Sequence, residues 1–248
     1  MQIDINVDMG ESFGMYTMGN DAELMPHITT ANVACGFHAG DPSVMRKTVT
    51  LAIQNGVRVG AHPSLPDLQG FGRREMKMAM SEIRDDMVYQ IGALKAFVEA
   101  GGQRLQHVKP HGSLYGMMAR SQEVSRAVCE AIREIDPNLF LYTMKKGVAG
   151  ETAAEMGLRV VYEVFGDLDY DAEGNLVITR QHAVLKPEEV AGRVLRMVRD
   201  KKVTATTGAE IEIEGDSVCL HSDSPGALTL LKTVRRALEA AGYSIQAP

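Results

Sequence analysis

The sequence predicts an α/β protein of one domain, residues 1–248, in which six or seven strand–helix units form a closed or nearly closed β/α barrel. Short apolar runs alternate with amphipathic helical stretches along the chain, which is typical of parallel strands joined by crossover helices. A length of 248 residues suits one such barrel. Several strand candidates end in a turn that holds a histidine or an acid, as barrel strands do where a site is built.

The strand candidates are short, rich in apolar and β-branched residues and bounded by turn residues. They are residues 2–7, 29–34, 57–61, 105–109, 139–143, 159–164, 176–179, 209–214 and 217–221. The last two alternate in period two around Glu214-Gly215-Asp216, so they form either a β-hairpin or two separate short strands.

The helical candidates are residues 42–55, 81–100, 122–134, 148–156, 187–200 and 225–241. Their first residues carry capping signals: Asp41 and Ser224 are each followed by proline, and Ser81 is followed by an acid. Glycines follow three of the stretches, as expected at helix C-termini: Gly56, Gly101 and Gly242.

Composition excludes several classes of function. The net charge of −6 and the lack of a long Lys/Arg cluster argue against a nucleic-acid groove. No apolar run is long enough to span a membrane, and the start MQIDINVD lacks the pattern of a signal peptide. The three cysteines are far apart and form no disulfide or zinc pattern: Cys35, Cys129 and Cys219. We therefore expect a cytoplasmic protein.

Four of the seven histidines share one setting, because each lies in a turn after a β-like run. They are His38 in ANVACGFHAGD, His62 in VRVGAHPSLPD, His111 in LQHVKPHGSLYG and His221 in SVCLHSDSPG. Asp8 in IDINVDMGES occupies the same kind of place. Since the carboxyl ends of parallel strands meet at one rim, we expect these side chains to lie together.

The first of these segments offers Asn6, Asp8 and Glu11 at the end of a strand. A carboxylate at this place acts as a general base or a metal ligand, or else it only caps the following turn. His38 follows the second strand between flexible glycines, and it is either part of the site or hydrogen-bonded locally.

The next segments add candidates of three kinds. A long Gly/Pro-rich loop follows His62 and ends at Arg73 and Arg74, which clamp an anion or are simply solvated. Lys109 and His111 flank a proline in extended chain, so they point to the same side. A cation beside an imidazole favours the neutral, proton-accepting ring.

The last segments are less specific. The acids of EVFGDLDYD lack EF-hand spacing, and most are expected in a solvated turn. Asp223 precedes the last helix, whose N-terminal amides favour an anion, and Asp223 itself suits an amine or amide. No phosphate loop, dinucleotide fingerprint, GxSxG elbow or HExxH motif occurs in the sequence.

Long motifs in nearly every part of the chain resemble those of the LamB/YcsF family, the family of 5-oxoprolinase A subunits. They are DINVDMGESFG, LMPHITTANVACGFHAGDP, GAHPSLPDLQGFGRR, YQIGAL, HVKPHGSLY, EVFGDLDY and HSDSPGA. The resemblance implies a single-domain, seven-stranded β/α barrel related to glycoside hydrolases and polysaccharide deacetylases. Some positions depart from the family pattern: Leu168 replaces an arginine, Ser222 replaces a glycine, and Ser64 and Leu65 replace Gly-Tyr.

The resemblance also implies a reaction, the ATP-dependent opening of the lactam 5-oxoproline to L-glutamate. ATP, with Mg²⁺, would phosphorylate the amide oxygen, and the 5-oxoprolinase subunits B and C would be partners. Asp8 or His62 would be the base, His111 would protonate the ring nitrogen, and Lys109 would stabilise the oxyanion or phosphate.

The resemblance places the substrate among further side chains, namely Asn6, Glu11, His38, Arg73 and Asp223. A divalent metal on Asp8, His38 and His62 is compatible with these residue types. Two other interpretations stay open. The chain could be a stand-alone metal-dependent deacetylase or amidohydrolase, or a module that binds the lactam and presents it to a catalytic partner.

Overall fold

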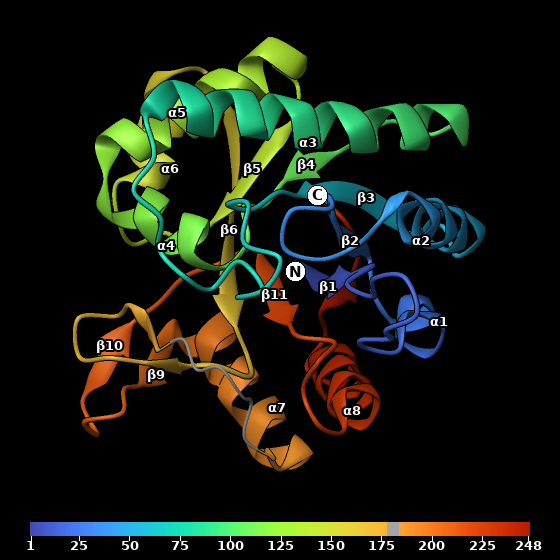
Figure 1. Ribbon diagram of the computed structural model, residues 1–248. Coiled ribbons are helices and arrows are strands. Elements are labelled where there is room, and N and C mark those ends of the chain that lie inside the picture. Colours follow the sequence, from blue (N-terminus) through green and yellow to red (C-terminus); the bar gives the residue numbers. More distant parts are fainter. Residues whose placement is uncertain (178–183) are drawn as a thin grey trace.

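The computed structural model describes residues 1–177 and 184–248, and its centre is a closed barrel of parallel strands (Figure 1). In these residues the barrel contains β1 (Gln2–Met9), β2 (Thr30–Ala34), β3 (Arg58–His62), β4 (His107–Val108), β5 (Phe140–Thr143), β6 (Arg159–Phe165) and β11 (Ser217–Leu220). Each strand pairs with the next, and β11 closes the barrel by pairing in parallel with β1. The predicted seven-stranded barrel is confirmed.

Helices surround the barrel (Figure 1). They are α1 (Asp21–Leu24), α2 (Pro42–Gln54), α3 (Met80–Ala100), α4 (Gly112–Arg120), α5 (Gln122–Ile135), α6 (Ala149–Glu155), α7 (Pro187–Leu195) and α8 (Ala227–Ala240). The sequence did not predict α4, since two glycines within GSLYGMMAR weaken its helical propensity. Among the described residues, no helix combines the length and apolarity needed to cross a membrane.

One open strand assignment is decided by the structure, and another needs correction. Residues 209–214 and 217–221 form two separate strands, the second of the two alternatives, because β10 (Glu210–Glu212) pairs with β9 (Lys202–Thr204) while β11 enters the barrel. The Asp216 amide donates to the Tyr162 carbonyl and so joins the chain before β11 to the barrel wall. The candidate 176–179 is not a barrel strand: its start is β8 (Leu176–Val177), which pairs with β7 (Asp169–Tyr170), and residues 178–179 lie outside the described residues.

Helix ends follow the predicted signals in part. Asp41 caps α2 by accepting from two backbone amides, as predicted. Ser81 lies inside α3, whose N-cap is Ala79. The last helix begins after Gly226, which takes the left-handed conformation. Left-handed glycines follow helices at the predicted Gly56 and Gly242, at Gly102 in place of Gly101, and also at Gly157 after α6.

The inside of the barrel is polar, whereas such interiors are usually filled by branched apolar residues. Along β1 the apolar side chains alternate with Asp4, Asn6 and Asp8, which make hydrogen bonds across the barrel. The Asp4 carboxylate accepts from Thr30 Oγ1 at 2.9 Å and from Tyr142 Oη at 3.1 Å. We call the buried polar side chains inside the barrel the interior network: Asp4, Asn6, Asp8, Thr30, Asn32, His107, Lys109, Tyr142, Glu163, Ser217 and Cys219.

Gly60 on β3 makes room for His107, its partner on β4. A Cβ atom at Gly60 would lie 2.1 Å from His107 Nε2, which donates to Asn32 Oδ1 at 2.7 Å. The lack of a side chain at Gly60 therefore lets the His107 imidazole occupy the inside of the barrel.

We expect Gly60→Ala to lower the free energy of unfolding by about 1–3 kcal/mol, because the ring must move and the interior network must shift with it. Gly92→Ala is the matched control, since its Cβ would meet only Ile135 Cδ1 at 3.8 Å. A helical alanine should stabilise the control by up to about 1 kcal/mol. Urea unfolding compares the two, and equal effects would contradict the role of Gly60.

A second prediction concerns pH. Burial, followed by the charge of Lys109, lowers the pKa of His107 to about 3. The unfolded chain therefore binds a proton at His107 below pH ~6.5 that the folded protein does not bind, and this costs up to about 1.4 kcal/mol per pH unit. This contribution to stability is complete above pH ~6.5 and is lost as the pH falls towards 3. Between pH ~7.5 and ~5, the free energy of unfolding should fall less steeply with pH in His107→Gln than in the unmodified protein. Equal slopes would refute the lowered pKa of His107.

Candidate functional site

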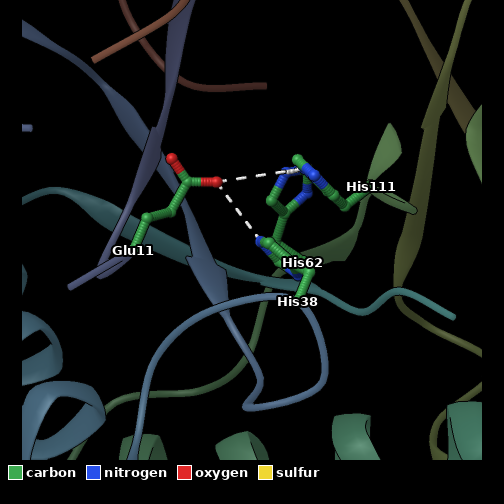
Figure 2. Close-up of side chains that lie close together, drawn as sticks. All are labelled: Glu11, His38, His62 and His111. Atoms are coloured by element: carbon green, nitrogen blue, oxygen red, sulfur yellow. Dashed lines mark hydrogen bonds and ion pairs between the residues drawn. The ribbon is translucent and has the colours of Figure 1, made fainter. Parts of the chain in front are cut away.

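The polar strand ends meet at the carboxyl rim of the barrel, as the sequence predicts. Asp8 is in β1, His62 ends β3, and Lys109 follows β4. Glu11, His38, His111 and His221 come from the loops that follow four different strands. Glu11, His38, His62 and His111 point towards one another (Figure 2).

Lys109 is the centre of the charges beneath the rim. Its Nζ atom lies 3.3 Å from Asp8 Oδ1 and 3.1 Å from Glu163 Oε2. It also donates to Asn6 Oδ1 at 3.1 Å and to Cys219 Sγ at 2.9 Å. The ammonium is therefore buried among acceptors. In such a buried group, the strength of each ion pair depends on the other members.

These contacts fix the charge states. Burial alone would raise the pKa of Asp8, but His62 and Lys109 outweigh it and hold the pKa well below its usual range. Burial alone would lower the pKa of Lys109, but Asp8, Cys219 and Glu163 hold it well above its usual range. The site therefore contains an ionised carboxylate beside a charged amine.

The histidines form a compact group above Lys109. His62 Nε2 lies 3.4 Å from Asp8 Oδ2 and 2.9 Å from His111 Nδ1. The His38 ring stacks on His111 with centroids 3.8 Å apart, and His38 Nε2 lies 3.2 Å from Glu11 Oε1. We call Glu11, His38, His62 and His111 the histidine cluster.

Burial dominates the protonation of this cluster. It lowers the pKa of His111, and His62 lowers it further. Lys109 is not among the principal causes, in contrast to the reasoning from the sequence. Burial also raises the pKa of Glu11, together with the negative charge of Asp8.

The loop after β3 forms the wall of the histidine cluster. Phe71 has a left-handed backbone with φ of 54°, and its carbonyl accepts from His111 Nε2 at 2.9 Å. Arg73 lies at the cavity and contacts Asp223 Oδ2 at 3.4 Å. Two of the predicted substrate-binding residues therefore form an ion pair with each other. Arg74 instead bonds to Asp67 within its own loop.

The sequence reasoning missed two acids as site residues. Glu163 is fully buried at an inward position of β6 and pairs with Lys109. Asp167 accepts from the ring and the backbone amide of His221, at 3.0 and 2.8 Å. A charged residue inside the apolar strand RVVYEVF was the available signal for Glu163. Asp171 makes an exposed turn with Asn175, as expected for most of these acids.

A cavity of about 50 Å³ opens beside these groups. Its polar walls include Asp8, His62, Arg73, Lys109, His111 and His221, and its apolar walls include Tyr115, Phe165, Leu168 and Leu176. Leu168, where the resemblance leads us to expect an arginine, thus lies at the cavity. Asn6 lies below it, fully buried, and contacts Lys109.

The fold and this site define a β/α-barrel protein with a charged, histidine-rich cavity at the carboxyl rim, and comparison with known proteins gives its family. The model of the LamB/YcsF family matches residues 3–248, so the chain belongs to that family. A protein of Pyrococcus abyssi, named as the A subunit of 5-oxoprolinase, is 50% identical over 99% of this chain and 97% of its own length. One of the same name from Bacillus licheniformis is 48% identical over 99% of this chain and 98% of its own.

Solved structures agree with the fold. The crystal structure of a lactam utilization protein from Thermus thermophilus has a TM-score of 0.93 at 44% identity and covers both chains completely. A putative cellobiose-phosphate cleavage protein from Enterococcus faecalis has a TM-score of 0.55 at 14% identity. It covers 99% of this chain and 96% of its own, and it supports the fold alone.

The ion cluster at Lys109 leads to a stability prediction. Lys109→Met leaves Asp8 and Glu163 buried without their cation, so we expect a loss of about 3–5 kcal/mol in unfolding free energy. Adding Glu163→Gln should recover part of it. Lys95→Met on α3 is the control, since its ion pair with Glu99 is at the surface, and it should change little. Chemical denaturation compares these variants with the unmodified protein, and an undiminished stability in Lys109→Met would contradict the assignment.

Proposed function

We propose that this chain is the A subunit of an ATP-dependent 5-oxoprolinase, which hydrolyses 5-oxoproline to L-glutamate while ATP becomes ADP and phosphate. The observation that supports this most is the ionised Asp8 beside Lys109 at a rim cavity, in a chain about 50% identical to relatives of that name. The partners are subunits B and C, and the proposed location is the cytoplasm.

The chemistry requires activation, because a lactam carbonyl is a poor electrophile. In the proposed reaction the amide oxygen takes the γ-phosphoryl group of ATP, supplied with Mg²⁺, and ADP leaves. One water adds to the activated carbon, and the carbon–nitrogen bond breaks as the nitrogen gains a proton. A second water releases phosphate and leaves the γ-carboxylate of glutamate.

Asp8 is the base that we favour for the first water. It is ionised and lines the cavity. His62, the other candidate base, is less available, because its Nε2 atom already lies 3.4 Å from Asp8 Oδ2 and 2.9 Å from His111 Nδ1. Lys109 lies at the same wall and supplies the positive charge for a developing oxyanion or the phosphate.

The proton donor is better assigned to His221 than to His111. The pKa of His111 is lowered by burial, so its ring is neutral and a poor proton donor. Burial would also lower the pKa of His221, but Asp167 outweighs it and the pKa is raised. His221 Nε2 lies 3.7 Å from Asp8 Oδ2 at the cavity, and we place the ring nitrogen of the substrate near it.

The remaining site residues suit the two ends of the substrate. Arg73 would bind the carboxylate of 5-oxoproline, and Asp223, already at Arg73, would meet the lactam N–H. The cavity is below the ~300 Å³ typical of ligand pockets. Its walls must therefore move to admit 5-oxoproline, and further to admit the phosphorylated form. Since the sequence has no phosphate loop, we propose that subunits B and C contribute to the ATP site.

The test is a coupled assay of glutamate formation from 5-oxoproline, with and without ATP and with and without subunits B and C. Glutamate should appear only from the full complex with ATP. Asp8→Asn should reduce turnover by about 10²–10⁴-fold. Asp85→Asn changes an exposed acid on α3, so it is the matched control and should retain full turnover.

The other outcomes separate the rival functions. Glutamate formation without ATP would favour a metal-dependent amidohydrolase, for which the histidine cluster is the supporting feature. Normal turnover of Asp8→Asn in the complex would favour a lactam-binding module. An inactive complete complex would reject the substrate.

A further inference from the structure

In the histidine cluster, one ring nitrogen of His62 and one of His111 face each other at hydrogen-bond distance. His62 Nδ1 lies 2.6 Å from the Lys109 carbonyl oxygen, and His111 Nε2 lies 2.9 Å from the Phe71 carbonyl oxygen. A carbonyl only accepts, so both of these nitrogens carry hydrogen. In neutral rings, His62 Nε2 and His111 Nδ1 are then lone pairs, and they are 2.9 Å apart.

We propose that Glu11, His38, His62 and His111 form a binding site for one divalent transition-metal ion such as Zn²⁺. This inference goes beyond the proposed function and does not depend on it. Two facing lone pairs repel unless a cation lies between them, and a neutral imidazole is a preferred ligand of zinc. A shared proton would satisfy the two nitrogens, but it would not explain why Glu11 and His38 converge on the same point.

The spacing of the four ligand atoms fits a tetrahedral ion. Metal–nitrogen and metal–oxygen bonds of about 2.0–2.1 Å place tetrahedral ligands about 3.3 Å apart. The observed separations are 2.9 Å for His62–His111, 3.2 Å for Glu11–His38 and 3.9 Å for Glu11–His111. All four atoms lie within 4.8 Å of one another, and because the His38 and His111 rings are stacked, one of them must rotate before both nitrogens point at a single ion.

The surroundings resemble the support that metal ligands receive. Metal-binding histidines commonly donate their second N–H to a backbone carbonyl, which fixes the ring and its tautomer. The carbonyls of Lys109 and Phe71 do this here, and Phe71 adopts a left-handed backbone in doing so. Glu11 is a buried carboxylate that lies within hydrogen-bond distance of the His38 ring, and a cation would offset the cost of its burial.

Asp8 is a weaker candidate than the sequence suggested. Its Oδ1 atom accepts from Asn32 at 2.8 Å and lies 3.3 Å from Lys109. The group of Asp8, Cys219 and His221 also has ligand spacing, but the Lys109 ammonium lies 2.9 Å from Cys219 Sγ and already provides a cation there. The metal set that we infer therefore keeps His38 and His62 and replaces Asp8 by Glu11 and His111.

The test is metal binding by the full-length chain, stripped with a chelator and titrated with Co²⁺ or Zn²⁺ at pH ~8 without ATP or substrate. We expect one ion per chain by elemental analysis, the visible absorption of tetrahedral Co²⁺, and a raised Tm. Glu11→Gln keeps the side-chain shape and should weaken binding at least about tenfold, as should His111→Ala. His27→Ala removes a histidine outside the cluster and should bind normally.

The outcomes are separable from catalysis, because no turnover is measured. Circular dichroism establishes whether each variant is folded. If His111→Ala does not fold, Glu11→Gln alone tests the site. Absence of a stoichiometric ion in the unmodified chain would overturn the site in favour of a shared proton. Unchanged binding in folded Glu11→Gln and His111→Ala would place the ion elsewhere.

Discussion

The buried ammonium of Lys109 is the constraint on which the site depends. A charge inside a barrel must be balanced there, and the carboxylates of Asp8 and Glu163 both do so. Asn6 and Asn32 then orient these partners, and Gly60 leaves the space that His107 needs. The rim groups therefore rest on a polar core, which positions them more rigidly than loops could alone.

Much of the architecture follows from local sequence. Parallel strands were recognisable because apolar runs alternate with helical stretches, and the histidines after them could be placed at one rim. The failures have physical reasons. For β11 the sequence left a hairpin and a separate strand both open, because a short alternating strand carries no sign of its distant partners β1 and β6. The start of α8 depends on the left-handed Gly226, which a cap-plus-proline pattern does not reveal.

The site shows the same limit. Asp8, His62, Lys109 and His111 were identifiable from their turns, but their pairwise contacts were not. Glu163 is marked in the sequence as a charge inside an apolar strand, but Asp167 lies in a turn with further acids, so the sequence could not separate it from the solvated Asp171. Which ring nitrogen carries the proton depends on a backbone carbonyl such as that of Phe71. Because every residue has a carbonyl, the sequence does not reveal which one a histidine contacts. The roles of His111 and His221 could therefore be distinguished only in three dimensions.

The polar interior of the barrel also affects how mutational data on this family should be read. A chain of hydrogen bonds runs from the interior to the cavity. Asn6 donates to Ser217, and Asn32 donates both to Asn6 and to Asp8, which lines the cavity. Loss-of-function screens would therefore score residues deep in the barrel as if they belonged to the active site. Strong epistasis is expected among them, since one replacement alters the best choice at the next. In this fold, a severe phenotype alone does not distinguish a group that performs chemistry from one that supports it.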